Sequence, residues 1–269
     1  MDIRHSAVAG MFYPDSCDEI NRYIKRFNEM LDGGKFDPKS ELFPRAIISP
    51  HAGYIYSGFT ANMAFRTAAF NNPKVKRIIV IGPSHKAYID GASIALYDAY
   101  QTPCAALKID RELSRRLEAA YGFLHFSPGA HSEHSTEVQM PFVQHYFSHA
   151  EVVEIVYGQV DPMAISHLID ALLSDEDNFI VISTDLSHFY TKSEAKTLDT
   201  ICLSAIQNLD PEQFDSGCEA CGITGVKAII SSAVKCNLRS SLLDYRTSAD
   251  TTGDESNVVG YTSALLGTS

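Results

Sequence analysis

Three short apolar runs in this 269-residue chain each lead into a side chain that binds metals or moves protons. The runs are 78–81 before His85, 46–48 before His51, and 179–182 before Asp185. Unbroken runs of Ile, Val and similar residues are typical of strands that are buried on both faces of a parallel sheet. The pattern therefore predicts an α/β fold with functional side chains just beyond three buried strands.

In open α/β sheets, ligands bind beyond the carboxyl ends of the strands. His51 follows one such strand end and His85 follows another. A neutral imidazole is a good ligand for iron, copper, zinc and nickel. One histidine after a strand is more often an ordinary loop residue, but two at matched strand ends favour a shared metal site.

Length and composition fit one domain spanning 1–269, with a mostly parallel central sheet flanked by helices. The net charge of −11 argues against nucleic acid or an anionic membrane as a partner. No apolar stretch reaches the length of a membrane span, and Met1–Arg4 lacks the apolar core of a signal peptide. We therefore expect a cytoplasmic protein whose six scattered cysteines are reduced thiols.

Periodicity and turn residues place the remaining elements. The loop 51–58 contains Gly53, Gly58 and two tyrosines, and its Tyr54 supplies a flat wall with a polar tip. We expect an Ala-rich helix at 59–70, a loop at 122–136 and a helix at 137–147. Further helices are expected from Asp15 or Ser16 to 33 and at 110–120, 162–173, 193–209 and 225–234. Further strands are expected at 92–97, 151–157, 238–246 and 257–265, and the third apolar run lies in a strand expected at 178–183.

Asp185 and His188 lie three residues apart, directly after the third buried strand. On a helical turn, both side chains would point the same way. A carboxylate beside an imidazole raises the imidazole pKa and fixes its tautomer, which suits a general acid or base. The alternative is that Asp185 only caps the following turn.

The segment 217–222 contains a Cys-x-x-Cys pair, Cys218 and Cys221, just ahead of a predicted helix. A structural zinc site would need a second such pair, which the sequence lacks. A cysteine at a helix N-terminus has a lowered pKa and presents a thiolate, a good soft metal ligand. Cys221 is therefore the candidate third ligand, with a redox dithiol or a buried inert thiol as alternatives.

The polar stretch 129–139 contains two more histidines, His131 and His134. Both are candidates for supporting the metal ligands or contacting a substrate, and Glu133 and Glu137 are placed to orient them or to cap a helix. A solvated loop is the competing interpretation, and it is the stronger one for His131.

Taken in order, these motifs resemble the Memo (mediator of cell motility) family. The residues that carry the resemblance are Pro50-His51-Ala-Gly-Tyr54, Gly82-Pro83-Ser84-His85, Glu133-His134-Ser135 with Glu137 and Gln139, Asp185-Leu-Ser-His188 and Cys221-Gly222. The resemblance extends from Gly10–Pro14 to Gly260-Tyr261 and so covers almost the whole chain. The family is similar in fold to the class III extradiol ring-cleaving dioxygenases.

The resemblance implies a metal set of His51, His85 and Cys221. It further implies Asp185, His188 and His134 as catalytic side chains, and Tyr54, Glu137 and Gln139 as substrate-binding ones. Ring-cleaving relatives hold iron(II) with two histidines and a carboxylate, whereas a cysteine takes the third place here. A thiolate favours copper(I) or a differently tuned iron. The expected cofactor is therefore iron(II) or copper.

Two main hypotheses follow for function. The first is a dioxygenase-like, metal-dependent oxidoreductase in which His188, oriented by Asp185, moves protons. The second is a non-catalytic adaptor that uses the same cavity for a small molecule, a peptide or a partner protein. Metal-dependent hydrolysis is a third. Microbial family members resemble one component of a set that includes a radical-SAM protein and an AMMECR-type protein, which are the implied partners.

Overall fold

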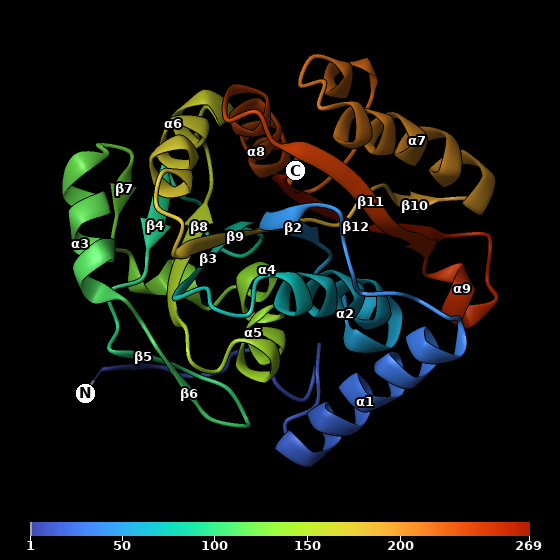
Figure 1. Ribbon diagram of the computed structural model, residues 1–269, viewed down its shortest axis with the longest axis horizontal. Helices are drawn as coiled ribbons and strands as arrows, with labels where there is room; N and C mark the ends of the chain where they lie inside the picture. The colour runs from blue at the N-terminus through green and yellow to red at the C-terminus, as the bar shows by residue number, and fades with distance from the viewer. Residues whose placement is uncertain (1) are drawn as a thin grey trace.

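The computed structural model describes residues 2–269 as helices packed on both faces of one large sheet (Figure 1). Its strand order is β10-β12-β2-β9-β3-β8-β4-β7, and β11 also pairs with β12. The four central strands β2, β9, β3 and β8 are parallel, as predicted, whereas β12 and β4 run antiparallel to them. The sheet as a whole is therefore mixed. The bounds are β2 Phe43–Ser49, β3 Arg77–Pro83, β4 Ala92–Ile94, β7 Leu124–His125, β8 Glu151–Tyr157, β9 Asn178–Ser183, β10 His188–Tyr190, β11 Arg239–Thr247 and β12 Val258–Thr268.

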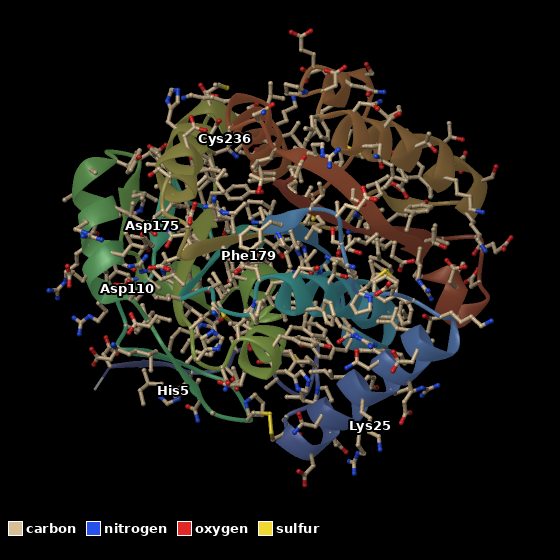
Figure 2. All side chains as sticks on the ribbon, viewed as in Figure 1. His5, Lys25, Asp110, Asp175, Phe179 and Cys236 are labelled. Atoms are coloured by element: carbon tan, nitrogen blue, oxygen red, sulfur yellow. A yellow bond between two sulfur atoms is a disulfide. The ribbon has the colours of Figure 1, made fainter. Side chains whose placement is uncertain are left out.

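The central strands are mostly apolar because both of their faces are covered, although Arg45 and Glu154 are buried among them. Ile47, Ile78 and Val181 belong to the core on one face. Their neighbours in sequence, Ile48 and Ile79, belong to the core on the other face, as the alternation of a strand requires. Figure 2 shows side chains filling both layers, with Phe179 in the interior.

Helices α1, α2, α4 and α5 lie on one side of the sheet in Figure 1, and α6, α7 and α8 lie on the other. A small separate sheet has the order β1-β5-β6. The helices are α1 Cys17–Gly33, α2 Tyr54–Asn71, α3 Arg111–Ala120, α4 His134–Glu137, α5 Met140–Tyr146, α6 Pro162–Leu173, α7 Lys192–Asn208, α8 Ile223–Lys235 and α9 Ala249–Thr252, with 3-10 turns at Pro128–His131 and Gln213–Ser216. The small strands are β1 Ile3–Arg4, β5 Ala99–Gln101 and β6 Ala106–Lys108.

Three predictions about local structure are wrong. Helix α2 begins at Tyr54, within the predicted loop 51–58. Gly58 lies inside this helix and packs against α1, where an added Cβ would lie 2.8 Å from Phe27 Cζ. This glycine allows close helix packing within α2. The expected helix at 137–147 is split into α4 and α5, and the expected loop 122–136 contains β7, a 3-10 turn and most of α4.

The prediction of six reduced cysteines is also wrong. Cys17 is disulfide-bonded to Cys104, and Cys202 is bonded to Cys218. The paired Cα atoms lie 4.5 and 5.0 Å apart although 87 and 16 residues separate them in sequence. This proximity arises from tertiary folding, which cysteine spacing alone does not reveal. Cys221 and Cys236 are free thiols.

Within residues 2–269, no helix combines the length and the apolar character needed to cross a membrane.

Candidate metal centre

Parallel pairing brings the predicted ligands together beyond one edge of the sheet. Ser49 in β2 pairs with Ser183 in β9, and Ile81 in β3 pairs with Ile182, so the three strands end side by side. The chain then continues to His51 and His85 and, after a longer path, to Cys221, two residues before the first residue of α8. One ligand atom from each of these three residues lies within 4.8 Å of the other two. The predicted convergence is therefore present in the fold.

The imidazole of His51 is held in one tautomer. Its Nδ1 lies 2.9 Å from Ser183 Oγ, while that hydroxyl donates its single proton to the Ser135 carbonyl at 2.5 Å. Gln139 Nε2 also donates to Ser183 Oγ, at 2.9 Å. The hydroxyl has no proton left for His51, so Nδ1 must carry the proton and Nε2 keeps its lone pair. The Nε2 atom lies 3.4 Å from Cys221 Sγ.

Glu133 arranges the second histidine. Its Oε2 accepts the backbone N–H groups of His85 at 2.6 Å and Lys86 at 3.0 Å, and its Oε1 accepts those of His134 and Ser135. The same Oε1 lies 2.8 Å from His134 Nδ1. Burial alone would raise the pKa of Glu133, but the His134 imidazole and the His85 N–H outweigh it and bring the pKa to about 2. Glu133 is thus a buried anion that fixes two histidine-bearing segments.

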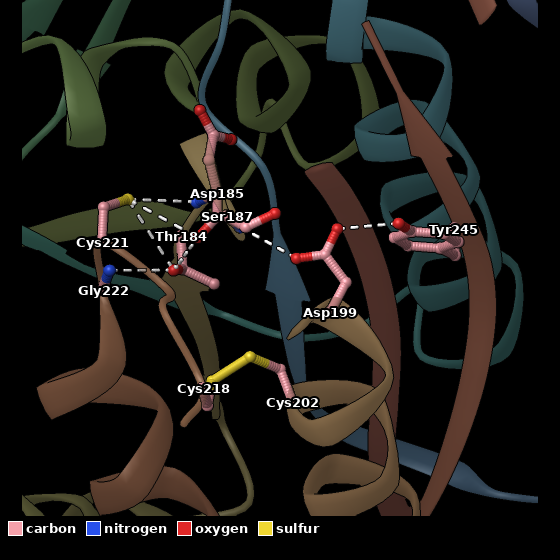
Figure 3. Close-up of a disulfide and its surroundings, with 9 residues drawn as sticks. All are labelled: Thr184, Asp185, Ser187, Asp199, Cys202, Cys218, Cys221, Gly222 and Tyr245. Atoms are coloured by element: carbon pink, nitrogen blue, oxygen red, sulfur yellow. Dashed lines mark hydrogen bonds between the residues drawn. A yellow bond between two sulfur atoms is a disulfide. The ribbon is translucent and has the colours of Figure 1, made fainter. Parts of the chain in front are cut away.

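Cys221 is held by the segment that follows β9, as Figure 3 shows. Its Sγ accepts the Asp185 N–H at 3.2 Å, and its own N–H donates to the Asp185 carbonyl at 3.2 Å. Thr184 Oγ1 accepts the N–H of Gly222 at 2.9 Å. Gly222 is needed here because an added Cβ would lie 2.7 Å from both Ser183 O and Thr184 Cβ. These contacts with residues 184–185 therefore fix the position of the thiol.

The electrostatics of the centre differ from the prediction for Cys221. Burial, together with the Asp185 carboxylate, raises the pKa of the thiol to about 12, so the expected thiolate is wrong for the metal-free chain. The helix dipole at the N-terminus of α8 favours a thiolate too weakly to compensate for this desolvation. Burial and the neighbouring His85 keep the pKa of His51 well below its usual range. Burial and His134 likewise lower the pKa of His85.

The spacing of two of the three donors suits a single metal ion. Neutral imidazole and cysteine bind such ions at about 2.0 and 2.3 Å, which at a tetrahedral angle separates N from S by about 3.5 Å. The separation between His51 Nε2 and Cys221 Sγ in the structure is 3.4 Å. The two imidazoles meet edge to face with ring centroids 5.3 Å apart. His85 is solvent-exposed whereas His51 is buried, which leaves one side of the centre accessible.

A comparison with known proteins agrees with the motifs. Residues 4–265 match the model of a family described as Memo-like protein. The chain belongs to the Memo family. It is 35% identical to a MEMO1 family protein of Aquifex aeolicus over 97% of this chain and 98% of that protein. MEMO1 family proteins of Methanobrevibacter smithii and Methanosarcina acetivorans are 33% and 32% identical, covering 98% and 99% of this chain and 99% and 100% of theirs.

In this Memo-family chain, Asp185 lies against the candidate ligands His51 and Cys221. Its Oδ1 accepts the backbone N–H of His51 at 2.8 Å, and its Oδ2 lies 4.0 Å from His51 Nε2. Burial raises the pKa of Asp185, although the His51 N–H and the nearby His188 oppose the rise. The segment from Asp185 to His188 is extended and leads into β10, so the helical turn considered from sequence is wrong.

Other predicted residues lie further from the ligands. Tyr54 is 2% exposed and stacks on Phe142, with its OH donating to the Val138 carbonyl. Glu137 is fully buried and accepts Tyr13 OH at 2.7 Å, the Val8 N–H and the Arg4 guanidinium. These contacts secure the N-terminal segment.

Gln139 is also fully buried, and its Nε2 donates a hydrogen bond to Ser183 Oγ, the atom that contacts His51 Nδ1. His134, by contrast, packs against both ligand imidazoles, with ring centroids 5.4 Å from His51 and 4.8 Å from His85.

Sequence reasoning missed two contributors to the centre. Phe12 stacks on His134 with ring centroids 4.5 Å apart, so the N-terminal segment forms one wall. Ser183 sets the tautomer of His51 from the last position of β9. The signal for Ser183 was present, because a polar residue ends the apolar run 179–182. In the fold it pairs directly with Ser49.

Proposed function

We propose that this protein is a metal-dependent oxidoreductase whose His51, His85 and Cys221 hold one iron or copper ion. The observation that carries the proposal is the donor set itself: two imidazoles and one thiol within 4.8 Å of one another, accessible from the His85 side. Imidazole with thiolate suits copper and iron, whereas magnesium and calcium require oxygen ligands. When bound, such an ion supplies redox exchange with dioxygen or an oxidisable substrate.

The protein's own groups prepare this chemistry. The Ser183 hydroxyl keeps Nε2 of His51 unprotonated and available as a donor. Binding of a metal displaces the proton from Cys221, whose pKa of about 12 makes metal binding dependent on pH. Metal affinity should therefore rise as the solution becomes less acidic.

Proton transfer is assigned to Asp185 and His188 at the rim of the centre. Burial raises the pKa of the Asp185 carboxyl, which makes it a better base than an exposed aspartate. His188 lies close enough to influence the pKa of both Asp185 and His51, and it is only partly buried. It can therefore exchange protons with solvent while Asp185 faces the ligands.

Reconstitution under anaerobic conditions tests the proposal. Metal-free protein is loaded with Fe(II), Cu(I) or Zn(II), and oxygen uptake is measured with catechols and with thiols. We expect uptake with iron or copper and none with zinc, and we expect His51→Ala to lose both bound metal and uptake. The matched control is His125→Ala, which alters an exposed histidine on β7. Hydrolysis with zinc and no oxygen uptake with any metal would overturn the assignment.

A second candidate function is peptide binding without catalysis. One observation favours it: residues 10–15 and 53–56 line a groove of about 550 Å³. Phe12 is one of the lining residues, and it also stacks on His134 in the candidate metal centre. Met11 and Ile55 line this groove with 71% and 59% of their surface exposed. Binding of an apolar peptide with equal affinity by metal-free and metal-loaded protein would favour this role over oxidation.

A further inference from the structure

Helix α7 contacts both of the chain segments that carry the non-histidine side chains of the metal centre. Its residues Asp199 and Cys202 are three positions apart and therefore lie on one face of the helix. Both are fully buried. Figure 3 shows Asp199 directed towards Ser187 and Cys202 bonded to Cys218.

The first contact fixes the segment between Asp185 and His188. Asp199 Oδ1 accepts the backbone N–H of Ser187 at 2.9 Å. On the opposite side, the Ser187 carbonyl accepts the N–H of Gly260 at 2.9 Å, and the Gly260 carbonyl accepts the N–H of Leu186 at 2.8 Å. The backbone at 186–187 is therefore secured from α7 and from β12 at once.

Gly260 allows the Asp199 carboxyl group to reach this position. A Cβ at residue 260 would lie 2.1 Å from Asp199 Oδ2. That oxygen instead accepts the hydroxyl of Tyr245 at 2.7 Å. No Lys, Arg or His side chain within residues 2–269 forms an ion pair with Asp199, so its partners are one N–H and one O–H group. Burying a carboxyl group with so few partners is costly, and an apolar side chain would fill the space at less cost.

The second contact fixes the segment that leads to Cys221. The Cys202–Cys218 disulfide attaches this segment to α7 only three residues before the thiol. On the other side of the thiol, Gly222 donates its N–H to Thr184 Oγ1. The Cys-x-x-Cys pair thus has two unlike members, of which Cys218 is an anchor and Cys221 is a candidate ligand.

Asp185 transmits the first contact to the ligands. It lies two residues before Ser187 and contacts the backbone N–H of His51 as well as both the N–H and Sγ of Cys221. A shift of the 185–187 backbone would therefore alter the separation of His51 Nε2 and Cys221 Sγ. Two independent routes connect α7 to the same thiol.

We propose that α7 positions the metal centre: Asp199 is the positioning residue for Asp185, and the Cys202–Cys218 disulfide positions Cys221. The metal readout of this inference rests on the proposed function, whereas its backbone readout is independent of any metal. The two readouts separate a failure of one proposal from a failure of the other.

The test compares four variants by amide hydrogen exchange in metal-free protein and by Co(II) affinity. Asp199→Ala should speed exchange of the Ser187 amide at least tenfold and weaken Co(II) binding about tenfold. Asp199→Asn keeps an oxygen that accepts the Ser187 N–H, and it should restore both values to within about threefold of wild type. The double variant Cys202→Ser/Cys218→Ser should speed exchange at the Cys221 amide and weaken Co(II) binding similarly. Asp170→Ala, on α6, is the matched control for loss of a carboxyl group.

A merely structural role for α7 predicts a different pattern. Asp199→Ala would then lower the melting temperature and speed exchange across the whole sheet, with no excess at 185–188; that result overturns the proposal. Failure of Asp199→Asn to rescue the Ser187 amide would also overturn it. Should Asp199→Ala fail to fold, the exchange rates of the disulfide variant and of Asp199→Asn still test the proposal. Should wild type bind no Co(II), the metal assignment falls, and the exchange pattern alone settles the role of α7.

Discussion

Two clusters, the candidate metal centre and a second one formed by His131, Glu154 and Ser93, satisfy their histidine ring nitrogens in different ways. In the candidate metal centre, the Nδ1 atoms of His51 and His85 contact Ser183 and the Pro83 carbonyl, and His51 Nε2 lies 3.4 Å from Cys221 Sγ. In the second cluster, His131 is 1% exposed, with Nδ1 2.9 Å from Glu154 Oε2 and Nε2 2.9 Å from Ser93 Oγ.

The contrast distinguishes the candidate ligand histidines from a structural histidine by the partners of their ring nitrogens. Glu154 is fully buried, and its second oxygen accepts the Thr136 hydroxyl at 2.6 Å. Both ring nitrogens of His131 thus have protein partners. His51 and His85 each retain one nitrogen that faces the other ligands. The solvated-loop interpretation of His131 is wrong, since the residue belongs to a buried network.

The largest effect that separates the clusters is expected for His51→Ala. Loss of one of three donors should weaken binding of Cu(I) or Fe(II) by about a hundredfold or more, a larger loss than removal of a partner that only supports a ligand. His131→Ala should leave metal affinity within a few fold of wild type. Competition titrations against a chelator of known affinity measure both. Equal losses of metal affinity in the two variants would remove the distinction between the clusters.

The next effect concerns the free energy of unfolding, for which we expect the larger loss at His131. His131→Ala leaves the Glu154 carboxylate buried without its imidazole partner, and breaking a buried pair of this kind costs about 3 kcal/mol of unfolding free energy. Urea unfolding at neutral pH measures the change. His85→Ala, which truncates an exposed ligand, should cost less than about 1 kcal/mol. A His131→Ala protein as stable as His85→Ala would contradict the structural role.

A smaller effect is expected from Ser183→Ala. This change removes the acceptor that keeps the proton on His51 Nδ1, so the ring is free to rotate or to adopt the other tautomer. Partners of this kind contribute about tenfold or more to metal affinity. Metal titration with Ser93→Ala as the matched control, which removes the hydroxyl beside His131, should show weaker binding only for Ser183→Ala.

The smallest effect is a pH dependence of stability in the buried cluster. Burial by itself raises the pKa of Glu154, but the His131 imidazole and Arg4 outweigh it and hold the pKa below its usual 4.5. The stability that Glu154 contributes is therefore present above about pH 4.5 and is lost as the pH falls through the lower, folded-state pKa. Unfolding free energies between pH 6 and pH 3 should fall less steeply for Glu154→Gln than for wild type. Parallel slopes would contradict this assignment.

The elements that were predictable from sequence are those with strong local signals. Strands β8 and β9 and helix α6 begin and end at the predicted residues, because apolar runs flanked by turn residues leave little ambiguity. Strands β1, β5 and β6 have only two or three residues each, which is too short for a periodic signal. The pairing of β1 with β5 joins Ile3 to Ala99, so it depends on tertiary contacts. The start of α2 was missed because Gly58 serves helix packing.

The candidate site was predictable to the extent that strand ends reveal it. His51, His85 and Asp185 follow from the rule that parallel strands present their carboxyl ends at one edge. The protonation of Cys221 was mispredicted, since the cost of burying a thiolate depends on neighbours such as Asp185 that only the fold brings close. The role of Asp199 had no sequence signal, because its partner Ser187 is contacted through the backbone.

X-ray absorption spectroscopy of the iron- or copper-loaded protein tests the central claim most directly. We predict one sulfur neighbour at about 2.3 Å and two imidazole nitrogens at about 2.0 Å from the metal. The sulfur contribution should disappear in Cys221→Ser and remain in Cys236→Ser, which alters the other free thiol. A spectrum with only nitrogen and oxygen neighbours, or one that Cys221→Ser leaves unchanged, would contradict the claim that these three residues hold one metal ion.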